Sequence, residues 1–161
     1  MKLIVGLGNP GVRYQKTRHN VGQWLIDQVS SSKFQVSREV KLHKTSIFMN
    51  ESGREVKSLI TNYELPITNL LIVHDDLDLE PGRWKFQFNR SSAGHKGVQS
   101  IINELGTQEF WRLRIGIGKP PAGKTANQFV VEKPTSLELR LIRQAIEESI
   151  PRIQEWVKRS R

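Results

Sequence analysis

Short apolar runs along the chain predict strands in the middle of a sheet. The runs at residues 2–7 and 70–73 are bounded by glycine, asparagine or charged side chains and are too brief for helices. A third strand is expected at residues 112–118, where apolar residues and glycines follow the arginines. Strands buried on both faces are typical of parallel sheets.

Two other segments alternate apolar and polar residues, which predicts strands with one face in the core. Residues 36–48 alternate from Val36 to Leu42. In residues 84–88, three aromatic residues alternate with two polar ones behind a Pro-Gly turn, which indicates an antiparallel strand.

Apolar residues at helical spacing predict helices between these strands. The helices are expected at residues 21–29, after a capping box of Ser52 and Glu55, at residues 98–105, and from Thr135 with Glu138 as a second capping box. Pro151 should kink or split the last helix. Residues 119–127 are expected to form a loop.

Strands that alternate with helices indicate an α/β fold. We expect one domain over residues 1–161, with a mixed, mostly parallel twisted sheet sandwiched between helices. No apolar run approaches the length of a membrane span, and Met1 and Lys2 lead into only a brief apolar run, so no targeting or membrane segment is expected.

Glycines at positions 6, 8 and 11 match the pattern G-x-G-x-x-G of dinucleotide-binding folds. That fingerprint needs a helix to begin within the glycines, and the segment after Gly11 lacks helical periodicity. We therefore interpret the glycines as a tight loop at the end of a strand, with Asn9 as its chemical residue.

The chain is strongly basic, with 25 Lys and Arg against 16 Asp and Glu and a net charge of +9. This excess favours a polyanionic partner, although a purely solubilising surface remains the alternative. The basic residues are spread along the chain, which argues against attachment to a membrane surface. The absence of cysteine excludes disulfides, thiolate metal sites and a cysteine nucleophile.

Two of the four histidines lie at positions where functional groups concentrate. His19 and His95 each lie in a polar loop ahead of a predicted helix. His43 is expected on a solvent-facing strand surface, and His74 is expected to make structural hydrogen bonds. The two loop histidines are therefore the candidates for chemistry.

Asp75 follows a buried strand at its carboxyl end, where sites in α/β sheets form. Its carboxylate can hold an imidazole so that the other ring nitrogen takes a proton from water. Asn9 and Asn50 can each donate a hydrogen bond to a carbonyl oxygen that gains charge. Turn formation is the alternative role for these three residues.

The sequence blocks GLGNPGVRY, TRHNVG, FMNESG, HDDLDL, PGRWKF, GHKG and FWRLRIGIGKP occur in one order along nearly the whole chain. With these blocks in this order, the chain resembles the bacterial-type peptidyl-tRNA hydrolases. The resemblance implies hydrolysis of the ester that joins a peptide to the 3′ end of tRNA, without metal or other cofactor. It also implies peptidyl-tRNA as partner, and we expect a cytoplasmic monomer.

The resemblance assigns roles to individual residues. His19 corresponds to the general base, Asp75 to its orienting acid, and Asn9 and Asn50 to the groups that place the peptide and the ester. Further positions correspond to substrate contacts at Tyr14, Phe48, His95 and Lys96, and to tRNA phosphate contacts at Arg114, Lys85 and Lys124.

Three features depart from the family pattern. Lys96 stands where asparagine is usual, and Gln87 stands where a basic residue is frequent. The segment between the first helix and the FMN block is short, which predicts a reduced sheet edge. His19 and Asp75 are unaffected, so we expect activity with altered substrate affinity.

Two other functions compete with this interpretation. An RNA-binding protein without activity fits the charge but does not need His19, Asp75 and the asparagines together. A metal-dependent nuclease or phosphatase would use the acidic stretch HDDLD, whose spacing matches no ligand loop.

Overall fold

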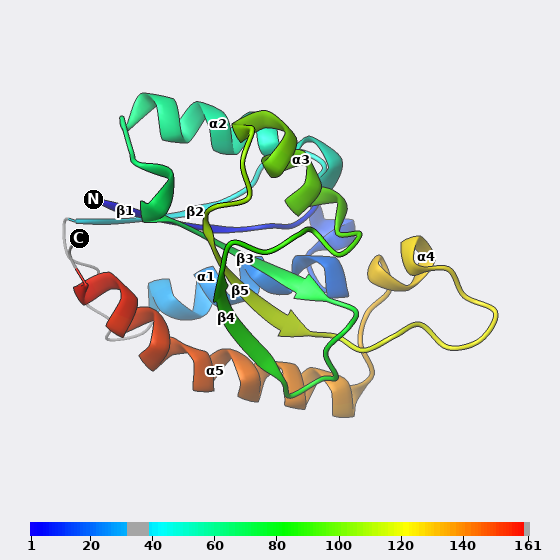
Figure 1. Cartoon of the computed structure of the whole chain (residues 1–161). Coiled ribbons are helices and arrows are strands. Elements are labelled where there is room, and N and C mark those ends of the chain that lie inside the picture. The colour runs from blue at the N-terminus through cyan, green and yellow to red at the C-terminus, as the bar shows by residue number, and fades with distance from the viewer. Residues whose placement is uncertain (32–38, 160–161) are drawn as a thin grey trace.

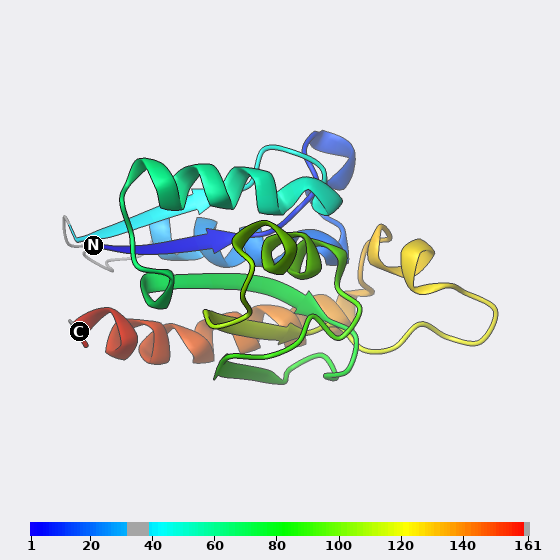
Figure 2. The same ribbon diagram turned by 45° about the horizontal axis from the view of Figure 1, so that its top comes forward.

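The computed structural model describes residues 1–31 and 39–159, which form three layers. A sheet lies in the middle, with helices on both of its faces (Figure 1 and Figure 2). One face is covered by α2 (Ser52–Asn62) and α3 (Lys96–Leu105), and the other by α1 (Val21–Ser31) and α5 (Ser136–Lys158).

The described strands are β1 (Lys2–Gly6), β2 (Val40–Lys44), β3 (Leu70–Asp76), β4 (Trp84–Phe88) and β5 (Trp111–Gly116). They form one sheet in the order β2-β1-β3-β5-β4. All neighbours are parallel except β4, which is antiparallel to β5. This arrangement confirms the predicted α/β class and the mixed, mostly parallel sheet.

Side chains of the central strands alternate between two cores, as the pleat of a strand requires. Ile4, Leu71 and Leu113 pack against α1 and α5. Leu3 and Ile72 pack against α2 and α3. The central strands therefore read as continuous apolar runs because both faces are covered.

Four of the five described strands have bounds that differ from the sequence prediction, β1 and β5 by only one or two residues at an end. Strand β2 ends at Lys44; the Thr45 N–H still donates to the Gly6 carbonyl, and the Thr45 hydroxyl bonds to the backbone of Gly8. Residues 36–38 of the predicted strand lie outside the described residues. Strand β3 continues to Asp76 because its pairing with β5 extends that far, so Asp75 lies within the strand.

The predicted helix starts are only partly confirmed. The capping box at Thr135 is present, but the one at Ser52 is not, since the Ser52 hydroxyl donates to the Met49 carbonyl of η3 (Met49–Glu51). The segment predicted as a loop contains α4 (Ala126–Val130), which begins with a capping box of Thr125 and Gln128. The T-x-x-Q signal was therefore readable in the sequence.

Pro151 does not split α5, which runs without interruption from Ser136 to Lys158. The proline side chain is exposed, whereas Ile153 and Trp156 beyond it are buried against the sheet. Burying large apolar side chains is worth about 1.5–3 kcal/mol each, which offsets the cost of about 3 kcal/mol for an interior proline.

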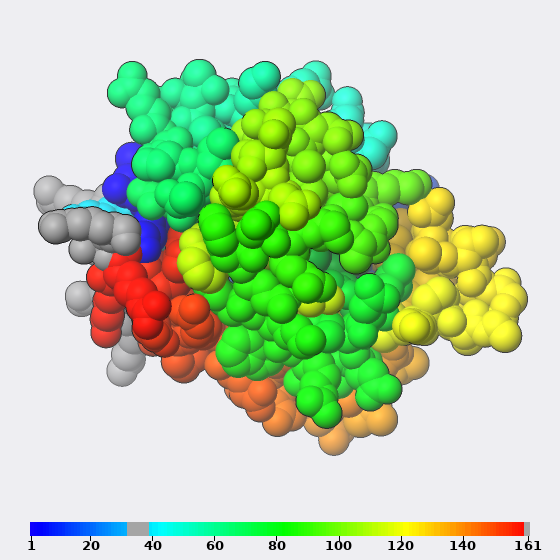
Figure 3. Space-filling model, viewed as in Figure 1, coloured from blue at the N-terminus to red at the C-terminus, as the bar shows by residue number. Residues whose placement is uncertain are grey.

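The molecule has two different ends along the strand direction. The N-terminus and the carboxyl end of α5 lie near the amino ends of the parallel strands, and α4 lies beyond the carboxyl ends (Figure 1). The segment that leads into α4 projects from the body (Figure 3). In the described part of the chain, no helix has both the length and the apolar character to cross a bilayer.

Candidate active site

Close backbone packing brings the start of α1 against the carboxyl ends of β1 and β3. A side chain at Gly22 would meet the Val73 carbonyl oxygen at 2.2 Å, and one at Gly6 would meet the Gly22 carbonyl oxygen at 2.4 Å. Only glycine permits these approaches. As a result, η2 (Arg18–Asn20), which precedes α1, lies beside the end of β3.

Arg18 fixes η2 to the chain around α4 and α5. Its guanidinium stacks over Phe129 at 3.7 Å from the ring centroid and donates to the Phe129 carbonyl at 3.1 Å. The same group pairs with Glu138 at 3.1 Å. These contacts hold the residue next to His19 in place, so the fold defines the position of the His19 ring.

Three ionisable side chains meet at the end of β3. His19 Nδ1 lies 2.8 Å from Asp75 Oδ2 and 3.0 Å from Oδ1. His95 Nε2 lies 2.8 Å from Asp75 Oδ1. The structure thus brings together His19, Asp75 and His95, which the sequence placed in three separate segments.

The protonated nitrogens of both rings follow from their partners. His95 Nδ1 accepts from the backbone N–H groups of Gly97 and Val98 at the start of α3, at 3.1 and 3.2 Å. Its proton therefore lies on Nε2, which donates to Asp75. His19 donates from Nδ1 to the same carboxylate, which leaves its Nε2 lone pair free to accept a proton.

The environment of Asp75 keeps its carboxyl ionised. Burial by itself raises the pKa of this group, but the charges of and hydrogen bonds from His19 and His95 outweigh burial and lower the pKa well below its ordinary value. An ionised Asp75 favours the imidazole proton on the near nitrogen of His19. It also stabilises the imidazolium that forms when Nε2 takes up a proton.

His74 has a structural role, as expected. Its Nδ1 donates to the Asp75 backbone carbonyl at 2.7 Å, and its ring lies 4.9 Å from that of His95. Burial and the nearby His95 lower the pKa of His74 to about 3. His74 is therefore neutral at physiological pH and supports the strand end without adding charge.

The glycine loop after β1 orients the side-chain amide of Asn9. Asn9 Oδ1 accepts from the Met49 N–H at 2.8 Å, which assigns the oxygen and leaves the NH2 group on the other side. The Asn9 backbone is held by Asn20 through bonds of 2.9 and 3.0 Å. No helix begins within the glycines, since α1 starts at Val21, so they serve this loop.

His19 lies between two cavities that share His19, Lys96, Asn127 and Val130. The first has a volume of about 250 Å³ and includes Asp75, His95 and the loop at residues 92–94. The second has a volume of about 580 Å³ and is lined by Asn9, His19, Phe48, Met49, Asn50, Lys96, Asn127, Val130 and Val131. A substrate bound across both would pass His19.

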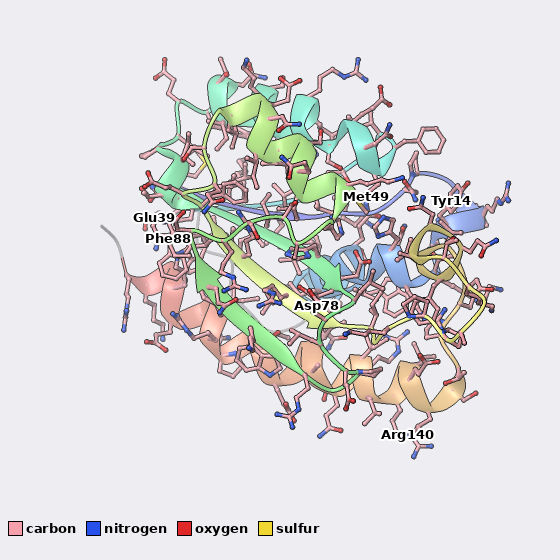
Figure 4. All side chains as sticks on the ribbon, turned by 45° about the vertical axis from the view of Figure 1, so that its right-hand side comes forward. Tyr14, Glu39, Met49, Asp78, Phe88 and Arg140 are labelled. Atoms are coloured by element: carbon pink, nitrogen blue, oxygen red, sulfur yellow. The ribbon has the colours of Figure 1, made fainter. Side chains whose placement is uncertain are left out.

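The aromatic candidates flank the second cavity. Phe48 is 53% exposed, and the Tyr14 ring meets it edge-on at 6.4 Å between centroids. Tyr14 belongs to η1 (Val12–Tyr14), and Tyr14 and Met49 lie on the same side of the molecule in Figure 4. Asn50 is exposed on η3 beside Phe48. The second cavity therefore combines amide donors with an open aromatic surface.

Known proteins are similar to this chain in both sequence and fold. The profile of the family described as Peptidyl-tRNA hydrolase matches residues 3–161. The chain belongs to the peptidyl-tRNA hydrolase family. Among named members, the peptidyl-tRNA hydrolase of Desulfitobacterium hafniense strain Y51 is 38% identical over 98% of this chain and 94% of its own length. That of Geobacillus kaustophilus strain HTA426 is 39% identical, with the same coverage.

Solved structures of the family have the same fold. The crystal structure of peptidyl-tRNA hydrolase from Acinetobacter baumannii superposes with a TM-score of 0.89 at 31% identity, covering 98% of this chain and 89% of that one. A complex of peptidyl-tRNA hydrolase with N-propanol gives the same TM-score. The fold that the resemblance implied is thus confirmed.

The three basic residues assigned to tRNA phosphates are not part of either His19 cavity. Arg114 is buried, donating to Asp76 at 2.7 Å and to Gln87 at 2.7 Å. This placement gives Arg114 a structural role within the family fold and does not support its predicted phosphate contact. Lys85 is exposed on β4, and Lys124 is paired with exposed Glu132 at 2.7 Å.

His19, Asp75 and His95 also offer ligand atoms within 4.8 Å of one another, which is close enough for a metal ion. However, His95 Nδ1 accepts two backbone N–H groups, so its Nε2 must carry the proton that a metal would displace. The acidic stretch offers no better set, because Asp76 is paired with Arg114. The donor set therefore suits an imidazole and carboxylate pair better than a metal.

The sequence analysis missed residues that complete the site. Asn20 holds the backbone of Asn9, and Asn127 and Val130 of α4 line both cavities. The T-x-x-Q capping box would have identified α4, but nothing in the local sequence indicates that this helix lies over His19. Its placement depends on the Arg18 contacts with Phe129 and Glu138.

Proposed function

We propose that this chain hydrolyses the ester between a peptide and the 3′ ribose of tRNA, with water activated by His19. The observation that carries the proposal is the double hydrogen bond that Asp75 accepts from His19 and His95. It sets the tautomer in which His19 Nε2 can act as a base. Membership in the peptidyl-tRNA hydrolase family supports the choice of substrate.

The reaction proceeds in two steps. His19 Nε2 takes a proton from water while the water oxygen attacks the ester carbonyl carbon, giving a tetrahedral oxyanion. The bond from this carbon to the ribose oxygen then breaks, and His19 returns the proton to that oxygen. The products are a peptide with a free carboxyl group and a tRNA with a free 3′ end.

Asn9 is positioned to stabilise the oxyanion. Since its oxygen is engaged by the Met49 N–H, its NH2 group is the part available to the second cavity. A donor fixed in advance of the reaction is typically worth about 10²–10³-fold in rate. Asn50, exposed on the same wall, is proposed to place the peptide.

Lys96 lies on the shared rim of both cavities, at the first residue of α3. A cation at a helix N-terminus is electrostatically unfavourable by itself, so a polyanionic substrate would relieve this cost. We therefore assign Lys96 to substrate contact, together with His95 as part of the cavity wall, Tyr14 and Phe48 near the 3′ end, and Lys85 and Lys124 as phosphate contacts.

The test uses N-acetylated aminoacyl-tRNA, with unblocked aminoacyl-tRNA as the comparison substrate. The full chain should release the blocked amino acid faster than the free one, and His19→Ala should bind tRNA but release little. Binding without release by the unmodified chain would instead support an RNA-binding protein. Loss of activity with a chelator, restored by Mg²⁺, would contradict the role given to Asp75.

A further inference from the structure

A third cavity lies at the opposite end of the sheet from His19. It has a volume of about 400 Å³ and is lined by Lys2, Thr68, Asn69, Phe88, Trp111, Arg152, Trp156 and Arg159. Lys2 and Trp111 begin the parallel strands β1 and β5, and Phe88 ends the antiparallel strand β4. Figure 4 shows Phe88 at the end of the molecule far from Tyr14 and Met49. We call this the amino-end cavity.

Aromatic rings form one wall of the amino-end cavity. The Trp111 ring lies 5.1 Å from that of Phe88 and 5.3 Å from that of Phe86, and Phe86 lies 6.3 Å from Trp156. Phe88 is 38% exposed, and Trp111 is only partly buried. Exposed ring faces of this kind can stack on a planar ligand.

Cations line the other side of the cavity. The Arg152 guanidinium stacks over Phe86 at 4.3 Å, and its Nη1 is buried without a hydrogen-bond partner among the described residues. Lys2 Nζ donates to the carbonyls of Trp156 and Arg159 and lies 4.4 Å from the Trp156 ring centroid. Burial and the charge of Arg159 lower the pKa of Lys2, which is consistent with a positive environment.

The cations that line the amino-end cavity are not neutralised by acidic lining residues. Among the lining residues, three are cationic and none is acidic. Glu155 pairs with exposed Arg159 at 2.8 Å, which leaves Lys2 and Arg152 without a carboxylate partner in the described part of the chain. A buried N–H donor without an acceptor is costly, and an anionic oxygen is the acceptor that a guanidinium prefers.

We propose that the amino-end cavity binds a nucleotide, with the base stacked on Trp111 and Phe88 and the phosphate bound by Arg152. A wall of aromatic rings beside unpaired cations is the pattern that recognises stacked bases and phosphates together. The nucleotide is either free or part of an RNA strand. The cavity is remote from His19, so the inference is independent of the proposed hydrolysis.

The experiment uses the 15N-labelled full chain titrated with 5′-AMP, and the indole N–H signals report the location of binding. The signals of Trp111 and Trp156, which line the cavity, should shift, whereas those of Trp24 and Trp84, which do not, should stay. Adenosine and ribose 5-phosphate should each bind at least tenfold more weakly, because each lacks one of the two contacts. Unmoved Trp111 and Trp156 signals at millimolar 5′-AMP would overturn the proposal.

Arg152→Gln removes the guanidinium charge but keeps a polar side chain, and it should weaken 5′-AMP binding at least tenfold. Arg140→Gln makes the same change on the same helix, away from the cavity (Figure 4), and should leave binding unchanged. Hydrolysis of N-acetylated aminoacyl-tRNA by Arg152→Gln confirms that the variant is folded. Equal binding by the two variants would contradict the assignment of the phosphate to Arg152.

A short oligoadenylate distinguishes the two sources of nucleotide. Binding at least tenfold tighter than 5′-AMP, with the same Trp111 and Trp156 shifts, would indicate that the cavity holds part of an RNA strand. Weaker binding than 5′-AMP would indicate a free nucleotide. Shifts by either ligand confined to residues around His19 would refute the amino-end cavity as a nucleotide site.

Discussion

Two pairs of histidine and carboxylate in this molecule have nearly the same local geometry. His19 Nδ1 lies 2.8 Å from Asp75, and His43 Nε2 lies 2.8 Å from Glu55. The Asp75 carboxylate also accepts from His95, whereas Glu55 also accepts from the backbone and hydroxyl of Ser46. The distance between the partners therefore does not distinguish a candidate catalytic pair from a structural one.

The surroundings of the two pairs differ in three ways. The side chains of His19 and Asp75 are 10% and 2% exposed, at the end of a central strand. Those of His43 and Glu55 are 32% and 15% exposed, beside the edge strand β2. His19 borders two cavities, and neither of them includes His43. The amide of Asn9 faces the same space as His19. A pair becomes a candidate for catalysis when it is buried, has a free ring nitrogen beside a cavity, and has an oxyanion donor nearby.

Replacing the two histidines tests this comparison most severely. His19→Ala should lower kcat for N-acetylated aminoacyl-tRNA by about 10²–10⁴-fold, the usual worth of a general base. His43→Ala should leave kcat within about twofold and cost at most about 1 kcal/mol of stability, as is typical of partly exposed pairs. Steady-state rates and urea unfolding of both variants provide the measurement. Equal losses of rate would show that the cavities do not select the functional pair.

Asn9→Asp isolates the proposed oxyanion donor. The aspartate keeps an oxygen for the Met49 N–H but loses the NH2 group, so the loop should remain folded while kcat falls by about 10²–10³-fold. Asn9→Ala is the companion variant, since it also removes the Met49 bond and should lower the melting temperature. Unchanged kcat in Asn9→Asp would remove the amide from the mechanism.

Asp75→Asn should lower kcat by about 10²-fold through the tautomer of His19. Two imidazole N–H groups donate to the Asp75 carboxylate, which has two acceptor oxygens. The side chain of asparagine has only one acceptor oxygen, because its other terminal group is an NH2 donor. The Gly97 and Val98 N–H groups fix the tautomer of His95, so His19 is the ring that must change. Its base nitrogen then carries the proton.

Glu55→Gln is the matched control for Asp75→Asn, because it makes the same change in the structural pair. It should leave kcat unchanged and alter only stability. The readout for Asp75→Asn is the pH profile of kcat together with the 15N tautomer signature of His19. A normal tautomer with a reduced rate would assign Asp75 a purely electrostatic role.

The sequence predicted the two cores of this fold well, but it predicted the ends of the strands less well. Both cores follow from apolar periodicity, because strands such as β3 and helices such as α1 bury a continuous or repeating set of side chains. The end of β3 was missed because Asp75 and Asp76 are polar, yet their pairing with β5 keeps them in the strand. Long-range pairing therefore overrode local composition.

The sequence predicted which residue types form the candidate site, but it did not predict how the fold arranges the elements around them. The residue types of His19, Asp75 and Asn9 indicated acid and base chemistry, and the structure brings their segments together. Nothing in the local sequence indicated that Arg114 would be buried against Asp76, since an arginine in a strand can equally well lie on the surface. The position of α4 beside His19 likewise depends on contacts distant in sequence.

His74, the neighbour of the catalytic candidate Asp75, gives the smallest effect and a test in stability alone. Its pKa is lowered to about 3 in the folded protein against an ordinary 6.5, so below pH 6.5 the unfolded state binds a proton that the folded state does not. Stability is therefore complete above pH 6.5 and falls toward pH 3, by at most about 1.4 kcal/mol per pH unit from this group.

His74→Asn should be less stable than the natural chain at pH 7.5, because it weakens the bond to the Asp75 carbonyl. The difference should narrow at pH 5, where only the natural chain loses stability through His74. Urea unfolding at the two pH values measures both quantities, and pH 5 lies above the range in which Asp75 takes up a proton. A difference that stays constant would mean that burial does not keep His74 neutral.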